Sequence, residues 1–376
     1  MVKLRRRDRA EPRASRTLGY RTDEGVMDKR YLAGRLTALL ASVAVLAGCA
    51  GGAPLSTAAT SAPSGAPSSS AGPSQVASPL PSASTAAAFY QAGVDLWNQG
   101  RWDDAVEAFT KAIELDPTRA TAFINRGAAQ EKLGNHDLAL ADFTKAIELD
   151  PANGGTVYNR GVAYADQGKL DLAIADFTKA IELDPTDAEA ILSRGAAYYP
   201  AGKLDLAIAD FTKAIELDPT DARAFYNRAI VFTDQAKFDL AIADNTKAIE
   251  LDPTNSWAFG NRGAAYYSGG EVELAVADFT KAIELDPTNG GTFYNRGVAY
   301  ADQGKLDLAV ADYTKAIELD PTDAWTFYSR GVANVLRGDT EGASADFDRA
   351  LSLTSDPELV SKITRYRCSA GLGCEP

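Results

Sequence analysis

Few side chains in this 376-residue sequence belong to the types that perform covalent or metal chemistry. The sequence holds one histidine, His136, and three cysteines, so a catalytic or metal-binding site built on histidine lacks ligands. Most of the 51 acidic residues recur with a repeated pattern, as expected of solvated faces or packing partners, and no glycine-rich phosphate loop follows a strand-like segment. The sequence therefore predicts no enzyme activity, no cofactor and no metal site.

The first cysteine, Cys49, ends a short apolar run. Residues 36–49 read LTALLASVAVLAGC after Arg35, and the thirteen residues before the cysteine are too few for a membrane span of about 20. The final LAGC resembles the lipobox of bacterial lipoproteins, which implies cleavage before Cys49 and attachment of a diacylglyceryl group to it. A hydrophobic tail with a chance cysteine is the alternative. Residues 1–48 are thus expected to be a lipoprotein signal peptide, with Met27 as an alternative start.

The segment after this cysteine differs in composition from the rest. Residues 49–85 are uncharged and rich in Ala, Ser, Pro and Gly, which predicts a disordered linker between the lipid and the remaining chain. Residues 1–35 hold 11 of the 38 basic and 5 of the 51 acidic residues, so cleavage would leave a net charge of −19. Such acidity argues against nucleic acid and anionic lipid as partners. Membrane attachment is expected through the lipid alone.

The other two cysteines lie near the C-terminus. Cys368 and Cys374 flank a short glycine-containing loop after an amphipathic stretch, 357–367. In an oxidising compartment this even pair could form a disulfide, and two free thiols are the alternative.

The middle of the chain repeats with a fixed period. The phrase TKAIELDP occurs seven times at intervals of 34 residues, first at Thr110. With its proline as position 32, eight units cover residues 86–357. Each unit contains two helical apolar patterns, which in the third unit predict helices over about 156–167 and 170–183. Asp-Pro ends each second helix, and Asp or Asn at position 34 suits the N-cap of the next first helix.

The apolar positions of each unit form one pattern. In the third unit, small residues stand at positions 8, 20 and 27 (Gly161, Ala173, Ala180), with Tyr164 at 11 and Phe177 at 24. This pattern resembles the tetratricopeptide repeat (TPR). The resemblance implies an all-α fold, a right-handed α-solenoid of eight 34-residue helical hairpins. It also implies that the first helices line a concave groove and that residues 358–376 form a capping helix and a cysteine-containing tail.

Two charged positions change together among the units. Units two to eight carry Arg at position 7 and Asp at position 23, whereas unit one has Ala92 and Ala108. This predicts structural salt bridges between the two helices of a unit, with an anion-binding role for the arginines as the alternative. The predicted pairs are Arg126–Asp142, Arg160–Asp176, Arg194–Asp210, Arg228–Asp244, Arg262–Asp278, Arg296–Asp312 and Arg330–Asp346.

The resemblance also assigns ligand-facing positions, namely 2, 5, 6, 9, 12 and 13 of each first helix. Position 6 is asparagine in five units: Asn125, Asn159, Asn227, Asn261 and Asn295. An amide offers a donor and an acceptor that match a peptide backbone, and bonding between neighbouring helices is the alternative. Position 5 adds the tyrosines Tyr90, Tyr158, Tyr226, Tyr294 and Tyr328. These residues are the predicted peptide-binding groove, and the aspartates Asp166, Asp234 and Asp302 at position 13 favour basic or neutral ligands.

The fifth unit departs from the pattern. Asn245 replaces the phenylalanine of position 24, and Ala236 replaces the glycine of the turn. If position 24 is still an apolar pocket there, Asn245→Phe is expected to stabilise the unit.

These patterns lead to one functional hypothesis with an alternative. We expect a noncatalytic TPR scaffold, lipid-anchored on the extracytoplasmic side of a bacterial membrane, that binds proteins or extended peptides in its groove. The alternative is a recruiter or accessory subunit of an envelope polysaccharide or secretion complex that docks a folded partner.

Overall fold

The structure is a computed structural model that describes residues 85–373, and every regular element in this range is an α-helix. The first helices of the eight units (helices A) are α2 (Ala86–Asn98), α4 (Ala120–Lys132), α6 (Gly154–Asp166), α8 (Ala188–Tyr198), α10 (Ala222–Asp234), α12 (Ser256–Ser268), α14 (Gly290–Asp302) and α16 (Ala324–Arg337). The second helices (helices B) are α3 (Trp102–Leu115), α5 (His136–Leu149), α7 (Leu170–Leu183), α9 (Leu204–Leu217), α11 (Phe238–Leu251), α13 (Val272–Leu285), α15 (Leu306–Leu319) and α17 (Thr340–Leu353). The predicted all-α series of helical hairpins is confirmed.

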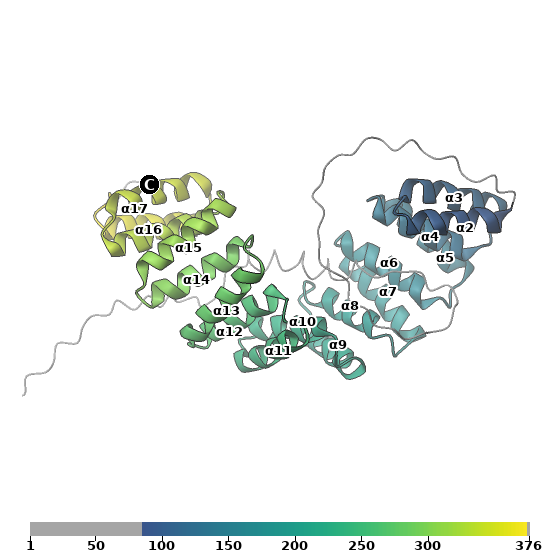
Figure 1. The fold of residues 1–376 in the computed structure, drawn as a ribbon, viewed down its shortest axis with the longest axis horizontal. Helices are drawn as coiled ribbons and strands as arrows, with labels where there is room; N and C mark the ends of the chain where they lie inside the picture. Colours follow the sequence, from purple (N-terminus) through teal and green to yellow (C-terminus); the bar gives the residue numbers. More distant parts are fainter. Residues whose placement is uncertain (1–84, 374–376) are drawn as a thin grey trace, which may run out of the picture. The chain divides into compact units, whose positions relative to one another are not determined.

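The described chain divides within α12 into two compact parts, residues 85–265 and 266–373, and each is described by itself. Within each part, a helix packs mainly against the helices before and after it in sequence, as the labelled pairs α4–α5 and α6–α7 illustrate (Figure 1). Such nearest-neighbour packing is what a repeated helical hairpin produces, because no single pair can bury both of its apolar faces.

The helix ends follow from a few repeated residues. Side chains at position 34 cap helices A: Asn153 accepts a hydrogen bond from the backbone N–H of Thr156, and Asp187 accepts one from Ala190. The turn glycine before each helix B has a positive φ, +70° at Gly168, a conformation that only glycine adopts without strain. The aspartate before proline is extended, as at Asp184, and ends helix B. The predicted caps and stops are therefore present.

In six of the eight units the core contains a close contact between a glycine and an aromatic ring. Phe177 is fully buried, and a Cβ added to Gly161 would lie 2.8 Å from its ring. Gly195 and Phe211 show the same 2.8 Å spacing. Position 8 must therefore be glycine wherever position 24 carries a ring, because the two helices of a hairpin approach too closely for a methyl group.

The fifth unit has neither the glycine nor the aromatic ring of this contact. It has Ala229 at position 8 and Asn245 at position 24, and both are fully buried. The Asn245 amide nitrogen donates to the carbonyl of Ala241 at 3.0 Å, while its Oδ1 is buried without a partner. In the presence of Ala229 we expect Asn245→Phe alone to be unfavourable, because the methyl group of Ala229 occupies the space that the ring needs. Ala236 in the turn has φ +54° and is the non-glycine residue with positive φ in the described range.

The charged positions 7 and 23 form ion pairs across each hairpin. Arg160 binds Asp176 through two hydrogen bonds of 2.7 and 2.8 Å, and its third nitrogen donates to Thr144 of the preceding unit at 3.3 Å. The Asp176 carboxylate is buried, so these bonds compensate its desolvation. The same geometry joins Arg126–Asp142, Arg194–Asp210, Arg228–Asp244, Arg296–Asp312 and Arg330–Asp346. The arginines thus tie each hairpin together and to the preceding one.

A final helix, α18 (Pro357–Ser369), packs on the last hairpin. Leu359 and Ile363 are buried there, and Lys362 lies 5.1 Å from the ring centroid of Trp325. The helix therefore covers the apolar edge that the eighth unit would otherwise expose. Cys368, near its end, is disulfide-bonded. Cys374 lies outside the described residues, so the Cys368–Cys374 pairing stays a prediction.

Candidate functional site

The predicted groove residues lie on helices A, where positions 5 and 6 link consecutive units. The Asn125 amide donates to the hydroxyl of Tyr90 at 3.1 Å. The hydroxyls of Tyr158 and Ser193, again positions 5 and 6 of consecutive units, lie 3.2 Å apart. Ser329 donates to the hydroxyl of Tyr294 at 3.4 Å, completing the same contact a third time. These contacts match the alternative in which position 6 bonds neighbouring helices.

The tyrosines of position 5 also belong to the hairpin cores. The ring centroid of Tyr158 lies 5.5 Å from that of Phe177, which holds position 24 of the same unit. In the seventh unit the ring centroids of Tyr294 and Tyr313 lie 5.7 Å apart. Burial raises the pKa of the Tyr158 hydroxyl well above its usual range, so it remains a hydrogen-bond donor. Tyr226 is buried, and Tyr328 packs edge-on against Tyr366. These side chains are therefore structural first, with only part of each ring open to a ligand.

The five asparagines differ in exposure. Asn227 and Asn261 are 3% and 0% exposed, so a ligand reaches neither without rearrangement. Asn125, Asn159 and Asn295 are half-buried. The amide nitrogen of Asn295 is buried and has no hydrogen-bond partner within residues 85–373. Asn159 is therefore the position at which the predicted peptide contact stays open, whereas the Asn295 amide nitrogen reaches a ligand only if its side chain rearranges.

Positions 12 and 13 provide a second link that the sequence reading missed. The hydroxyl of Tyr199 donates to the carboxylate of Asp234, and that of Tyr267 donates to Asp302. Both pairs are separated by 35 residues, the same interval that joins positions 5 and 6. The repeat length predicts such pairs. Two residues 35 apart in a 34-residue repeat occupy position n of one helix A and position n + 1 of the next.

The corresponding pair in units two and three consists of two acids. Glu131 holds position 12 and Asp166 holds position 13, and burial, together with the charge of Glu131, raises the pKa of the Asp166 carboxyl. His136, whose Nδ1 lies 2.8 Å from a carboxylate oxygen of Glu131, lowers the pKa of Asp166 and so partly offsets this effect. Asp166 therefore faces a carboxylate where Asp234 and Asp302 each accept a hydrogen bond from a tyrosine hydroxyl.

Some carboxylates on both helices A and helices B have a cationic partner. On helices B, Asp176 has Arg160, and Glu182 has Lys179 at 3.1 Å. On helices A, Arg223 binds the carboxylates of both Glu189 and Asp221. By contrast, Asp166, Asp234 and Asp302 are exposed and have no Lys or Arg within ion-pair distance in the part of the chain that the structure describes. The helix A face therefore carries carboxylates available to an incoming cationic group.

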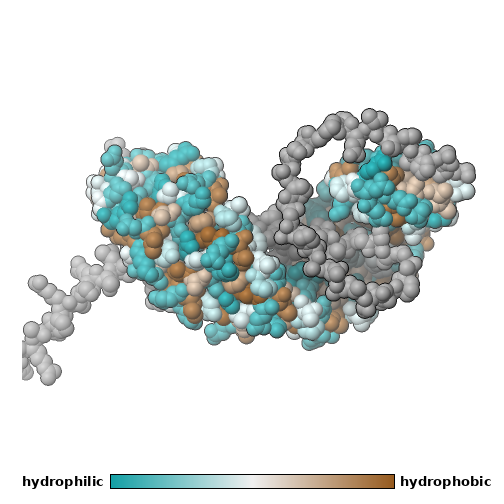
Figure 2. All heavy atoms as spheres, in the orientation of Figure 1, coloured by the Kyte–Doolittle hydropathy of each residue, from teal (hydrophilic) through white to brown (hydrophobic). Residues whose placement is uncertain are grey.

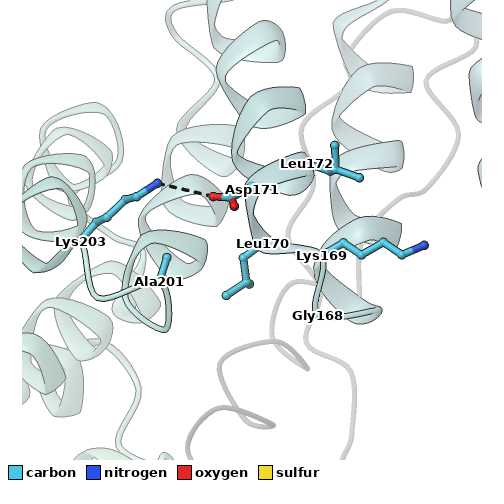
Figure 3. A pocket seen from close by; sticks show the side chains of 7 residues that line it. All are labelled: Gly168, Lys169, Leu170, Asp171, Leu172, Ala201 and Lys203. Atoms are coloured by element: carbon cyan, nitrogen blue, oxygen red, sulfur yellow. Dashed lines mark ion pairs between the residues drawn. The ribbon is translucent and has the colours of Figure 1, made fainter.

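Other kinds of site are not found in the described range. No group of His, Cys, Asp and Glu within residues 85–373 is placed to hold a metal ion. The helices over the same residues are all too short or too polar to cross a bilayer. A pocket of about 440 Å³ lies between the turns of units three and four, lined by Leu170, Leu172 and the ion pair Lys203–Asp171 (Figure 3). Cys49 lies outside the described residues, so its lipidation stays a prediction.

Family comparisons agree with this architecture. Sequence models described as tetratricopeptide repeat or TPR repeat match residues 90–154, then 157–187, 222–255 and 292–323, and also 195–235 and 263–304. The chain is a tetratricopeptide repeat protein. Its fold is the all-α TPR solenoid that the repeat pattern implied. A search of curated proteins gives no match to the chain.

Solved structures show the same fold. A TPR protein from Parabacteroides merdae is 21% identical with a TM-score of 0.53, and the match covers 66% of this chain and 98% of that one. PilF from Pseudomonas aeruginosa is 18% identical with a TM-score of 0.52, over 58% and 98% of the two chains. YrrB, described as a TPR protein with an unusual peptide-binding site, is 27% identical with a TM-score of 0.43, over 50% and 97%. TPR proteins of this kind are protein-interaction scaffolds.

Proposed function

We propose that this TPR protein binds the basic or neutral extended segment of a protein partner on its helix A face, and performs no chemistry on it. The observation that carries the proposal is a pair of exposed carboxylates on helices A of residues 85–265, Asp166 and Asp234, which have no Lys or Arg within ion-pair distance among the described residues. Asp302 gives residues 266–373 the same feature. A ligand that brings Lys or Arg to this face gains charge pairing without breaking an existing ion pair.

The Asn159 amide completes the proposed site in residues 85–265, and Asn295 holds the equivalent position in residues 266–373. An amide donates to a peptide carbonyl and accepts from a peptide N–H, so it contacts the ligand backbone whatever its side chains are. Affinity then comes from the backbone, and preference for basic segments comes from the neighbouring carboxylates.

We further propose that the scaffold is held at a membrane through a lipid on Cys49, on the extracytoplasmic side. The LAGC sequence after an uncharged apolar run supports this, as does the uncharged linker that follows. The net charge disfavours direct attraction to anionic lipid, so the acyl group supplies the attachment.

Site-specific photocrosslinking tests where the partner binds. A photoreactive amino acid is placed at Thr121 or Asp166 on helices A, and at Lys145 or Lys179 on helices B of the same two units, all of them exposed. We expect adducts from the helix A positions and few from the helix B positions. Adducts that form only from helices B would show that the partner docks on the opposite face.

A further inference from the structure

A row of exposed leucines runs along helices B, and no hairpin core uses it. Position 19 is leucine in six consecutive units. In residues 85–265 the exposed fractions are 57% for Leu138 and 49% for each of Leu172, Leu206 and Leu240. In residues 266–373 Leu274 and Leu308 are 45% and 49% exposed. The two terminal units lack it, with Asp104 and Gly342 at this position. Regularly placed half-exposed leucines are unusual on a soluble surface and indicate an interface.

The row is not explained as a simple copy of one ancestral unit. Position 17 is His136, Leu170 or Phe238 in different units, and position 16 changes from Lys169 to Glu271. Position 19 stays leucine in all six interior units while these neighbours differ. The alanine at position 20 already packs helix B into the hairpin core, so the exposed leucine beside it contributes little to that core. We therefore attribute its retention to a contact outside the hairpin.

The local surface suits packing against another apolar surface. On α7, Leu172 and Ala175 stand three residues apart and are both exposed, so they share one stripe of the helix. Leu172 also lines the pocket between units three and four, where Leu170 leaves the same turn in a different direction (Figure 3). Hydrophobic residues are interleaved with hydrophilic ones over the surface visible in Figure 2.

The charges beside the leucine row favour a second copy of this chain as the binding partner. On α7 the exposed Asp171 is matched by Lys203, and Lys179 is matched by Glu182. On α9 Lys213 is matched by Glu216, whereas Asp205 accepts a hydrogen bond from Gln235. The charges beside the leucine row on α7 and α9 therefore nearly cancel, although the whole chain has a net charge of −13. Two copies of so acidic a protein repel each other least where their charges cancel, and alternating Lys and Asp on one copy can pair with Asp and Lys on the other.

The repeat itself also favours a second copy. An identical chain carries leucines with the same spacing, so its row matches this one at successive units, whereas an unrelated surface has no such period. We infer that the leucine row of helices B, centred on Leu172 and Leu206, is a self-association surface that joins two copies of this chain through a two-fold contact. This interface goes beyond the proposed function, because it leaves helices A free for their ligand.

Co-purification of two differently tagged full-length copies, co-expressed and solubilised in mild detergent, tests the inference. We expect the second copy to be recovered with the first, and light scattering to give the mass of two chains. Leu172→Gln with Leu206→Gln should reduce recovery of the second copy by about tenfold or more, because four half-exposed leucines leave the interface. The matched control is Leu115→Gln, which removes a leucine that is 55% exposed but lies off the row. It should leave recovery unchanged.

Three results would overturn the inference: copies that do not co-purify, association that survives the double variant, or association lost equally in the Leu115→Gln control. Circular dichroism checks that the double variant is folded. If it is not, the single variants Leu172→Gln and Leu240→Gln are compared with the control in the same way. Photocrosslinking from helices A reports on the ligand independently, so failure of one proposal is distinguishable from failure of the other.

Discussion

The fifth unit permits a quantitative test of the packing argument. In six other hairpins a glycine at position 8 faces an aromatic ring at position 24, and an added Cβ would lie 2.5–2.8 Å from that ring. Here Ala229 faces Asn245. We expect Asn245→Phe alone to destabilise the unit by about 1–3 kcal/mol, because the ring is forced against the methyl group of Ala229.

The reciprocal change should also be unfavourable by itself. Ala229→Gly places glycine inside a helix and leaves space beside Asn245, which together cost about 1 kcal/mol or more. The double variant restores the pair used in the other units and removes the buried Oδ1 of Asn245, whose missing hydrogen bond costs about 1–3 kcal/mol. The two changes should therefore couple favourably by about 1–3 kcal/mol.

Hydrogen exchange resolved to peptides of α10 and α11 is the suitable assay, because a repeat array does not unfold as one cooperative unit. Exchange should accelerate in both single variants and slow to the parental rate or below in the double variant. Additive effects, or a stabilising Asn245→Phe in the Ala229 background, would refute the close-contact reasoning.

Three other outcomes are expected. Ala236→Gly should stabilise the turn of unit five by about 1 kcal/mol, since φ +54° strains an alanine, and slower exchange in α11 would show this while faster exchange would contradict it. Hydrogen bonds from the Thr186 hydroxyl and backbone N–H hold the pKa of Asp184 below its usual range, so its stabilising effect is present above the unfolded-state pKa and is lost as the pH falls through the folded-state pKa. Thr186→Val should therefore raise the pKa of Asp184 toward its usual range in an NMR titration, and an unchanged value would exclude the hydroxyl as the main cause. Cys49→Ser should abolish fatty-acid labelling and membrane retention, and a variant that stays labelled would disprove lipidation at this residue.

Much of the fold was predictable because one 34-residue pattern is repeated with little change. The predicted helix over 170–183 coincides with α7. The helix predicted over 156–167 begins two residues earlier, at Gly154, because the Asn153 cap outweighs the poor helix propensity of two glycines.

What the sequence did not reveal are contacts that cross from one unit to the next. Arg160 was paired correctly with Asp176, but Thr144 belongs to the preceding unit and was overlooked, although threonine opens every copy of TKAIELDP. The bond between Tyr90 and Asn125 matches the alternative given for position 6, although the sequence does not name the tyrosine as the partner. Position 6 was assigned to a ligand by resemblance, and the packing of neighbouring helices A determines how much of each amide remains available.

The central proposal is ligand binding on helices A, and its most direct test is a titration with the segment that photocrosslinking identifies. That segment, as a synthetic peptide, is titrated calorimetrically into the parental chain and into a variant carrying Asn159→Ala. The substitution should remove about 0.5–1.5 kcal/mol of hydrogen bonding, so affinity should fall about 2- to 13-fold with circular dichroism unchanged. An affinity that is unchanged in this variant would contradict binding through the amides of helices A.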